Sequence, residues 1–192
     1  MKEDYEVSEI SLEDARPIIQ NNNDKEDIYG LDYPWPNTLL HNFYGLFDKG
    51  NLVGAVQFCS YRYNPTPMFK KFMIEIFGCY TDTCEGFYEL TRLAVEPHDE
   101  HNITSWFLSR AIKLLNPKVI VTVAEEEKGG TIYKATNFDY YGIKYNRDFY
   151  EQDRPFHVYQ KIYDKNIQCE WEKTWQIRKS WDTSSMELIK RV

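Results

Sequence analysis

Phe87-Tyr88-Glu89-Leu90-Thr91-Arg92-Leu93-Ala94-Val95 is the stretch that decides how this chain is organised. Its aromatic and apolar residues predict a strand, and Pro97, which lacks an amide hydrogen, predicts where the strand ends. Apolar residues then recur at helical intervals over 104–115, and Asn116-Pro117 predicts the end of that helix. The β-branched run Val119-Ile120-Val121-Thr122-Val123 is typical of a strand that is covered on both faces. A strand, a helix and a second strand therefore form the centre of the predicted fold.

Further elements are predicted on both sides of this centre. Residues 5–10 alternate with a period of two, which predicts a strand, and Ser11 with Asp14 is close to a capping box that starts a helix over 12–20. The segment Asp48-Lys49-Gly50-Asn51 predicts the turn of a hairpin. The other predicted elements are a short helical turn at 38–41, hairpin strands at 43–47 and 52–58, a strand at 72–80, a helix at 131–137, and strands at 140–145 and 156–163.

Size, composition and charge restrict the class of protein. The chain has 192 residues, of which 42% are hydrophobic, and we expect one globular domain over 1–163 with an aromatic C-terminal extension over 164–192. Its formal net charge of -7 argues against binding a polyanion through overall charge. The four cysteines form neither a CxxC pair nor a zinc spacing, so we expect reduced thiols. Because we see no signal peptide and no long apolar run, we expect a soluble, cytoplasmic protein that does not bind a membrane.

The order of the predicted elements resembles that of the GNAT acyltransferases over about residues 5–163. The resemblance implies an α+β fold in which a central mixed, mostly antiparallel sheet is splayed into a V and carries helices on both faces. In that fold the strand that corresponds to 89–95 diverges from the strand that corresponds to 119–123. The pantetheine arm of acyl-CoA enters the gap, so the resemblance implies acyl-CoA or acetyl-CoA as a group donor.

The loop before the predicted helix at 104–115 departs from the GNAT pattern. GNAT enzymes usually show Q/R-x-x-G-x-G/A there, whereas this chain has Glu100-His101-Asn102-Ile103-Thr104-Ser105. Backbone amides at a helix start can bind a pyrophosphate, but the carboxylates of Asp99 and Glu100 would repel it. A donor site and a capped helix without a ligand are both open interpretations. A donor bound as in the GNAT fold would contact Leu93, Val95, Asn102, Thr104, Ser105 and Asn137.

Tyr133 belongs to a second GNAT-like stretch. Tyr133-Lys134-Ala135-Thr136-Asn137-Phe138 resembles the L-Y-x-x-x-G-F segment in which a GNAT tyrosine often protonates the leaving thiolate, with Asn137 in place of the glycine. A phenol with a pKa of about 10 can deliver that proton. The alternative is a tyrosine that only packs in the core.

Three stretches together resemble a narrower family, the bacteriophage Mom proteins. That family shows E-L-S-R-L, K-N-x-x-S and G-T-I-Y-Q-A-T-N-W at matching intervals. Upstream, His41 keeps the first member of a family His-Tyr pair, whereas Asn42 replaces the tyrosine. The corresponding stretches here are Glu89-Leu90-Thr91-Arg92-Leu93, His101-Asn102 with Ser105, and Gly130-Thr131-Ile132-Tyr133-Lys134-Ala135-Thr136-Asn137-Phe138.

The Mom resemblance implies conversion of adenine to N6-carbamoylmethyladenine in double-stranded phage DNA, which blocks host restriction enzymes. It implies His41 as a base and Arg92 as the group that neutralises a carboxylate or phosphate. Glu125 stands nearest to a family aspartate and would orient His41 or the amine, and Tyr133 would be the proton donor. The resemblance leaves both the donor and any metal undecided.

Other functions and partners fit the same residues. One is an acetyl-CoA-dependent N-acetyltransferase of a small amine, peptide or modified base, and another is a non-catalytic GNAT-like binding protein. Flipped bases stack on aromatic rings, which makes Tyr61, Tyr63 and the Tyr140-Tyr141 pair candidate DNA contacts. The C-terminal extension offers basic residues for phosphate contacts, or tryptophans for a homodimer contact. These residues are Lys173, Arg178, Lys179, Lys190 and Arg191, and Trp171, Trp175 and Trp181.

Overall fold

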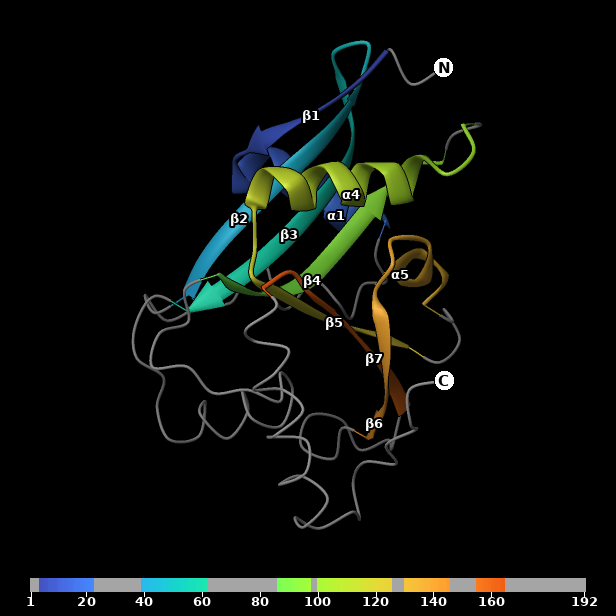
Figure 1. Cartoon of the computed structure of the whole chain (residues 1–192). Helices are drawn as coiled ribbons and strands as arrows, with labels where there is room; N and C mark the ends of the chain where they lie inside the picture. The colour runs from blue at the N-terminus through green and yellow to red at the C-terminus, as the bar shows by residue number, and fades with distance from the viewer. Residues whose placement is uncertain are drawn as a thin grey trace, which may run out of the picture.

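The described part of the chain builds one mixed sheet with helices on both faces (Figure 1). The computed structural model describes residues 4–22, 39–61, 86–97, 100–125, 130–145 and 155–164. Within them the strand order is β1-β2-β3-β4-β5-β7-β6, and only the β4–β5 pair is parallel. The elements are β1 (Tyr5–Ile10), α1 (Leu12–Asn22), β2 (Leu39–Asp48), β3 (Asn51–Tyr61), β4 (Phe87–Val95), α4 (Ile103–Leu115), β5 (Val119–Glu125), α5 (Thr131–Ala135), β6 (Asp139–Tyr145) and β7 (Pro155–Ile162).

The predicted hairpin is confirmed, but its strands are longer than the sequence pattern indicates. Lys49 and Gly50 take positive φ angles of 50° and 84° in the turn between β2 and β3. The helical turn expected at 38–41 is wrong for residues 39–41, because Leu39 already pairs with Tyr61 and His41 pairs with Cys59. Hydrogen bonding to β3 overrides the local preference there. His41 therefore lies on β2, at a position that pairs with β3 and comes before the residues of β2 that pair with β1.

β4 and β5 are parallel neighbours over a short distance and then diverge, as Figure 1 shows. Their register ends with the pair Glu89–Val121. Directly beyond it, the buried Thr122 donates a hydrogen bond from Oγ1 to the carbonyl oxygen of Leu90 at 3.0 Å. A buried carbonyl without a donor is costly, so this side chain replaces the missing backbone ladder. The expected V is thus present, with Thr122 at its apex.

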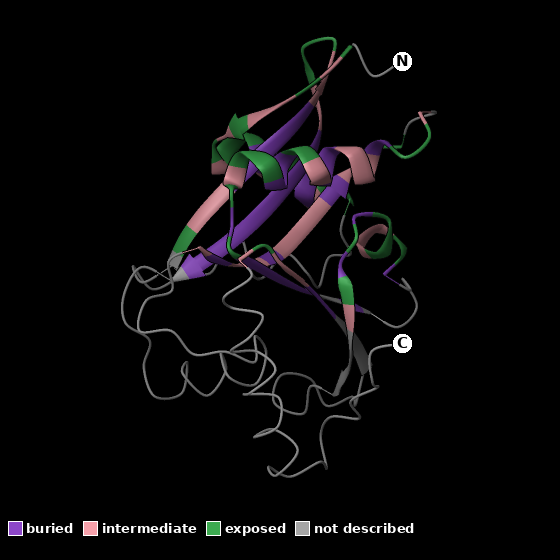
Figure 2. Ribbon diagram, viewed as in Figure 1, coloured by how far each residue is buried: buried purple, intermediate pink, exposed green. Residues whose placement is uncertain are grey.

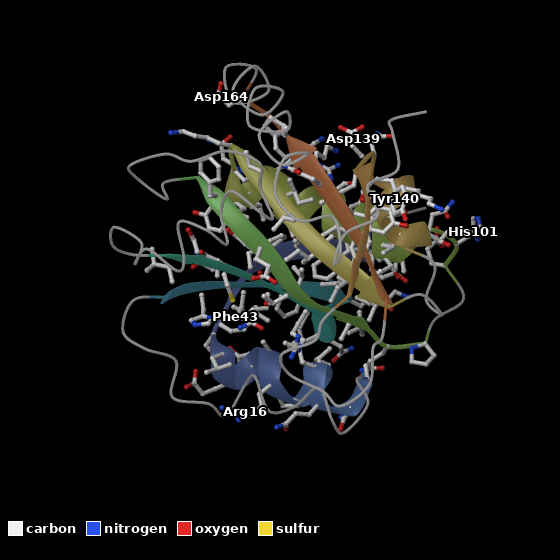
Figure 3. All side chains as sticks on the ribbon, turned by 90° about the horizontal axis from the view of Figure 1, so that it is seen from below. Arg16, Phe43, His101, Asp139, Tyr140 and Asp164 are labelled. Atoms are coloured by element: carbon white, nitrogen blue, oxygen red, sulfur yellow. The ribbon has the colours of Figure 1, made fainter. Side chains whose placement is uncertain are left out.

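Successive side chains along each strand point to opposite faces of the sheet, so the sheet has a core on each face. One long helix covers each core. On one face α4 packs Phe107, Leu108 and Ile112 on a cluster that includes Phe58 of β3 and Leu90 of β4. Figure 2 shows the buried strands beneath this helix and the exposed outer side of the helix itself. The opposite face holds a smaller core, in which α1 covers β2, β3 and β4. Its buried members are Ala15, Ile18, Ile19, Phe43, Ala55 and Ala94.

The predicted start of the first helix is confirmed, whereas the predicted end of the helix at 131–137 is not. The capping box is confirmed, because the Asp14 amide donates to Ser11 Oγ at 3.1 Å and Ser11 Oγ donates to the Asp14 carboxylate at 2.7 Å. The helix predicted at 131–137 is shorter, ending at Ala135. The predicted strand at 72–80 lies outside the described residues, and the domain boundary at 163 stays a prediction. Among the described helices, none is long and apolar enough to span a membrane.

Replacing Thr122 with Val should destabilise the protein. The valine fills the same volume but leaves the buried Leu90 carbonyl without its side-chain donor, and we expect the free energy of unfolding to fall by about 1–3 kcal/mol. Urea unfolding measures this change. Thr131→Val is the matched control, because Thr131 is exposed at the start of α5 and should stay within about 0.5 kcal/mol of wild type. Equal effects of the two changes would contradict the role of Thr122.

Gly130 should tolerate no side chain. It precedes α5 with a φ of 58°, and a Cβ atom there would overlap the ring of Tyr159. We expect Gly130→Ala to lower the free energy of unfolding by about 2–5 kcal/mol, from left-handed strain and overpacking together. Gly50→Ala is the control, because Gly50 also has a positive φ but a Cβ would meet nothing within 4 Å. Urea unfolding measures both variants. If Gly130→Ala lost no more free energy of unfolding than Gly50→Ala, the ring of Tyr159 would not be what excludes a side chain at Gly130.

Candidate functional site

A cluster of polar side chains lies on the α1 face of the sheet, where β2, β3 and β4 run side by side. We call it the His41 cluster, and its members are His41, Gln57, Cys59, Thr91 and Arg92. Thr91 and Arg92 come just after Glu89, the last residue of β4 that pairs with β5. The cluster therefore sits next to the point where the two strands separate.

A β-bulge in β4 shapes the cluster. Arg92 pairs with Gln57 and Leu90 pairs with Phe58, so Thr91 is an extra residue in the β4 strand. Bulges re-aim side chains and are frequent beside active sites. The Thr91 hydroxyl donates to the Gln57 carbonyl at 3.4 Å, and Arg92 donates from Nη1 to the Thr91 carbonyl at 2.8 Å. The guanidinium of Arg92 is thereby held against the bulge.

His41 contacts two partners through one ring nitrogen. Its Nδ1 lies 3.0 Å from Gln57 Nε2 and 3.2 Å from Cys59 Sγ, and its ring stacks on Phe43 at a centroid distance of 6.3 Å. Burial lowers the pKa of His41 below its ordinary value of 6.5. The imidazole is therefore neutral at pH 7.

The Cys59 thiol is protonated in this environment. Burial, supported by the negative charge of Glu89, raises its pKa to about 12, against the smaller opposing effects of a hydrogen bond with Thr91 and the charge of Arg92. Its Sγ lies 3.5 Å from Thr91 Oγ1 as well as near His41. Cys59 is buried, and within the described residues it forms no disulfide. A thiol with so high a pKa is a hydrogen-bond donor and a poor nucleophile.

Tyr133 lies on the other face of the sheet. Its ring packs 5.7 Å from the ring of Phe138 and 5.3 Å from that of Tyr159, on the core that α4 covers. The structure thus brings His41 and Arg92 into one cluster on the α1 face of the sheet. Tyr133 lies on the α4 face, separate from that cluster. Glu125 is the last residue of β5, paired with Phe156. The catalytic roles expected of these four residues stay predictions.

The residues expected to bind a donor also lie on the α4 side. Leu93 and Val95 of β4 pack against the core beneath α4. Asn102 precedes α4 with a φ of 61° and forms no side-chain cap, and Ser105 Oγ donates to its carbonyl at 3.0 Å. Thr104 lies in the first turn of α4, which has no acidic residue, and Asn137 follows α5 with a φ of 60°. Donor binding by these six residues stays a prediction.

Ile103 stands at the first of the two positions where the GNAT pattern has a glycine. Its side chain is fully buried in the core beneath α4, so it anchors the first turn of the helix. The first-turn amides of an α-helix have no partner within the helix, and they suit an anion. Backbone amides are therefore the groups at this helix start that would hold a phosphate, and donor binding there stays a prediction. For a metal, the described residues hold no group of three or more His, Cys, Asp or Glu side chains that could bind one.

Sequence reasoning missed Gln57, Cys59 and Thr91. Gln57 is only 3% exposed, and a polar residue inside the apolar run of β3 was a signal for its special role. Nothing in the local sequence marks Cys59 or Thr91. Their contact with His41 and Arg92 depends on the strand register and on the bulge.

Acidification should destabilise the folded protein partly through His41. The lowered pKa means that the unfolded chain takes up a proton at His41 first as the pH falls, so stability is lost as the pH drops through 6.5. We expect the free energy of unfolding to fall less in His41→Asn than in wild type between about pH 7.5 and about pH 5.5. Urea unfolding at both pH values measures the difference. An equal or larger loss in the variant would contradict a buried, neutral His41.

Solved structures share the fold at low sequence identity. An IAA acetyltransferase from Bacillus cereus superposes with a TM-score of 0.54 at 11% identity, covering 82% of this chain and 99% of the other. A GNAT family acetyltransferase from Elizabethkingia anophelis, solved with acetyl-CoA bound, gives 0.54 at 13% identity and covers 84% and 99%. A spermidine N-acetyltransferase from Vibrio cholerae gives 0.52 at 13% identity and covers 83% and 94%. These similarities show that the chain has the GNAT fold.

Comparison with curated proteins gives no match. Comparison with protein families gives a match to the Mom protein family that extends over residues 4–191. The match includes every element of the described sheet and both halves of the V. This chain, with its GNAT fold, belongs to the Mom protein family.

Proposed function

We propose that this chain is an enzyme that converts adenine in double-stranded DNA to N6-carbamoylmethyladenine. The observation that carries the proposal is that His41 and Arg92, which come from two separate family-like stretches, belong to one cluster beside the apex of the V. Cys59 and Thr91 connect them. The match to the Mom family over residues 4–191 supports it. In infected bacteria such an enzyme would act in the cytoplasm, where phage DNA is copied.

The two faces of the sheet suit two reactants. The α4 face carries Leu93, Val95 and Tyr133, and the α1 face carries the His41 cluster. In this proposal the donor binds from the α4 side, the flipped adenine binds from the α1 side, and they meet where β4 and β5 separate. An adenine in a duplex must leave the base stack to reach such a site.

A CoA-type molecule is the proposed donor. The first-turn amides of α4 would hold its phosphates, together with Asn102, Thr104 and Ser105. Its leaving group would be bonded to the methylene carbon of a carbamoylmethyl group, because attack of N6 on the thioester carbonyl of an acyl-CoA would form an amide instead. The Elizabethkingia anophelis protein with the same fold is described with acetyl-CoA bound, which supports this donor class.

The positive charge of Arg92 and the neutral ring of His41 suit a reaction at the exocyclic nitrogen of adenine. The exocyclic N6 shares its lone pair with the ring and is a poor nucleophile. In the transfer a bond forms from N6 to the methylene carbon of the carbamoylmethyl group. The bond from that carbon to the donor's leaving group breaks, its electron pair stays on the leaving group, and the alkylated N6, which is then acidic, gives its proton to water. Arg92 supplies a permanent positive charge for a carboxylate or phosphate, and His41 is a neutral, proton-bearing ring in the same cluster.

DNA from cells that express the protein tests the proposal. The DNA is digested to nucleosides and their masses are measured, and we expect deoxyadenosine that is heavier by one carbamoylmethyl group. Arg92→Lys should lower the modified fraction at least about tenfold, because a lost charge-assisted hydrogen bond of about 1.5–3 kcal/mol corresponds to that factor or more. Arg110→Lys, an exposed change on α4, is the matched control and should leave the fraction unchanged.

Two other outcomes would replace the proposal. Unmodified DNA together with acetyl-CoA-dependent acetylation of a small amine or peptide would make the chain an N-acetyltransferase, like the solved structures that share its fold. Unmodified DNA without any transfer would favour a non-catalytic binding protein. Either result would overturn adenine modification.

A further inference from the structure

Gln57 is a buried polar side chain in the His41 cluster, and the proposed reaction assigns it no role. It is 3% exposed and lies on β3, diagonal to His41, which pairs with Cys59. Its side-chain nitrogen Nε2 is 3.0 Å from His41 Nδ1. Burying an amide is costly unless it forms hydrogen bonds, so a contact of this length in the core contributes to stability and orientation.

The direction of this hydrogen bond follows from the chemistry of the two groups. An amide NH2 group only donates, so His41 Nδ1 must accept with its lone pair. In a neutral imidazole one nitrogen accepts and the other carries the proton. His41 therefore carries its proton on Nε2.

Cys59 reinforces the same tautomer. Its Sγ lies 3.2 Å from Nδ1, and its thiol keeps its proton at neutral pH because burial raises the pKa of Cys59 to about 12. A protonated thiol can donate to Nδ1, and its sulfur is only a weak acceptor for a proton placed there. Two donors thus converge on one nitrogen, and a proton placed on Nδ1 would face both of them.

We infer that Gln57 and Cys59 are positioning residues that fix the tautomer of His41, so that His41 acts on the reactants as a hydrogen-bond donor through Nε2 and not as the base. The structural half of the inference stands on the contacts at Nδ1, and the catalytic half rests on the proposed function. A proton donor at this point suits the carbonyl oxygen of the transferred group or a ring nitrogen of adenine, both of which are acceptors. The N6 proton then passes to water, because N6 is acidic once its new bond to carbon has formed.

Nitrogen NMR tests the tautomer without any activity assay. The full-length protein is labelled with ¹⁵N-histidine, and the His41 signals are identified by their loss in His41→Asn. We expect an unprotonated Nδ1 and a protonated Nε2 at pH 7. The opposite assignment in the wild-type protein would overturn the inference whatever the variants do.

Gln57→Glu reverses the hydrogen bond at nearly constant volume. A carboxylate only accepts, so we expect Nδ1 to become protonated, with the charges of Glu89 and Arg92 present in both proteins. Gln160→Glu is the matched control, since Gln160 is 1% exposed on β7 and should leave the His41 signals unchanged. An unprotonated Nδ1 in Gln57→Glu would contradict control by Gln57.

Nucleoside masses test the catalytic half. We expect Gln57→Glu to lower the modified adenine at least about tenfold, the factor for one hydrogen bond of about 1.4 kcal/mol or more. His41→Asn, whose amide donates but is no base, should retain more modification than His41→Leu. Equal loss in both His41 variants would overturn the donor role. Wild-type protein that leaves adenine unmodified would overturn the proposed function and the catalytic half, while the NMR result would still decide the tautomer.

Discussion

The structure depends on the interruption of the parallel ladder between β4 and β5. These strands share a register only from Phe87–Val119 to Glu89–Val121, and a sheet that continued further would close the V. The bond from Thr122 Oγ1 to the Leu90 carbonyl takes over at the point of divergence. Because the acceptor is buried, this bond makes the separation of two adjacent strands compatible with a satisfied core.

A second irregularity on the other side of β4 complements the first. The extra residue Thr91 shifts the register with β3, and its carbonyl and hydroxyl hold Arg92 and connect to the Gln57 backbone. β4 is thus bulged toward one neighbour and separated from the other within a few residues. Such local departures from a regular sheet are features of functional sites. In this protein they bring charged and polar groups to the middle of an otherwise apolar sheet.

In the proposed reaction the α4 face of the sheet binds the donor, and the α1 face binds the adenine. α4 covers the larger core, which contains Tyr133 and the donor-side strand residues, while α1 covers a smaller core next to the His41 cluster. A sheet that is hydrophobic on both faces must be covered on both faces. The cluster lies in line with Phe43, Ala55 and Ala94 on the α1 face, so the packing that stabilises α1 also orients His41.

The sequence by itself determined the order of the elements, the capping box of Ser11 with Asp14, the hairpin turn at Lys49 and Gly50, and the resemblance to the GNAT fold and the Mom family. These features are local, because hydrogen bonds between near neighbours and hydrophobic periodicity produce them. The sequence also marked His41 and Arg92, but it predicted His41 in a helical turn. Only the tertiary structure decided that His41 lies on β2, that Gln57 and Cys59 meet its Nδ1, and that Tyr133 lies on the opposite face. The reason is physical: pairing register, the bulge at Thr91 and the divergence after Glu89 are set by contacts between distant segments, and shifting a strand by one residue would turn each of these side chains to the other face.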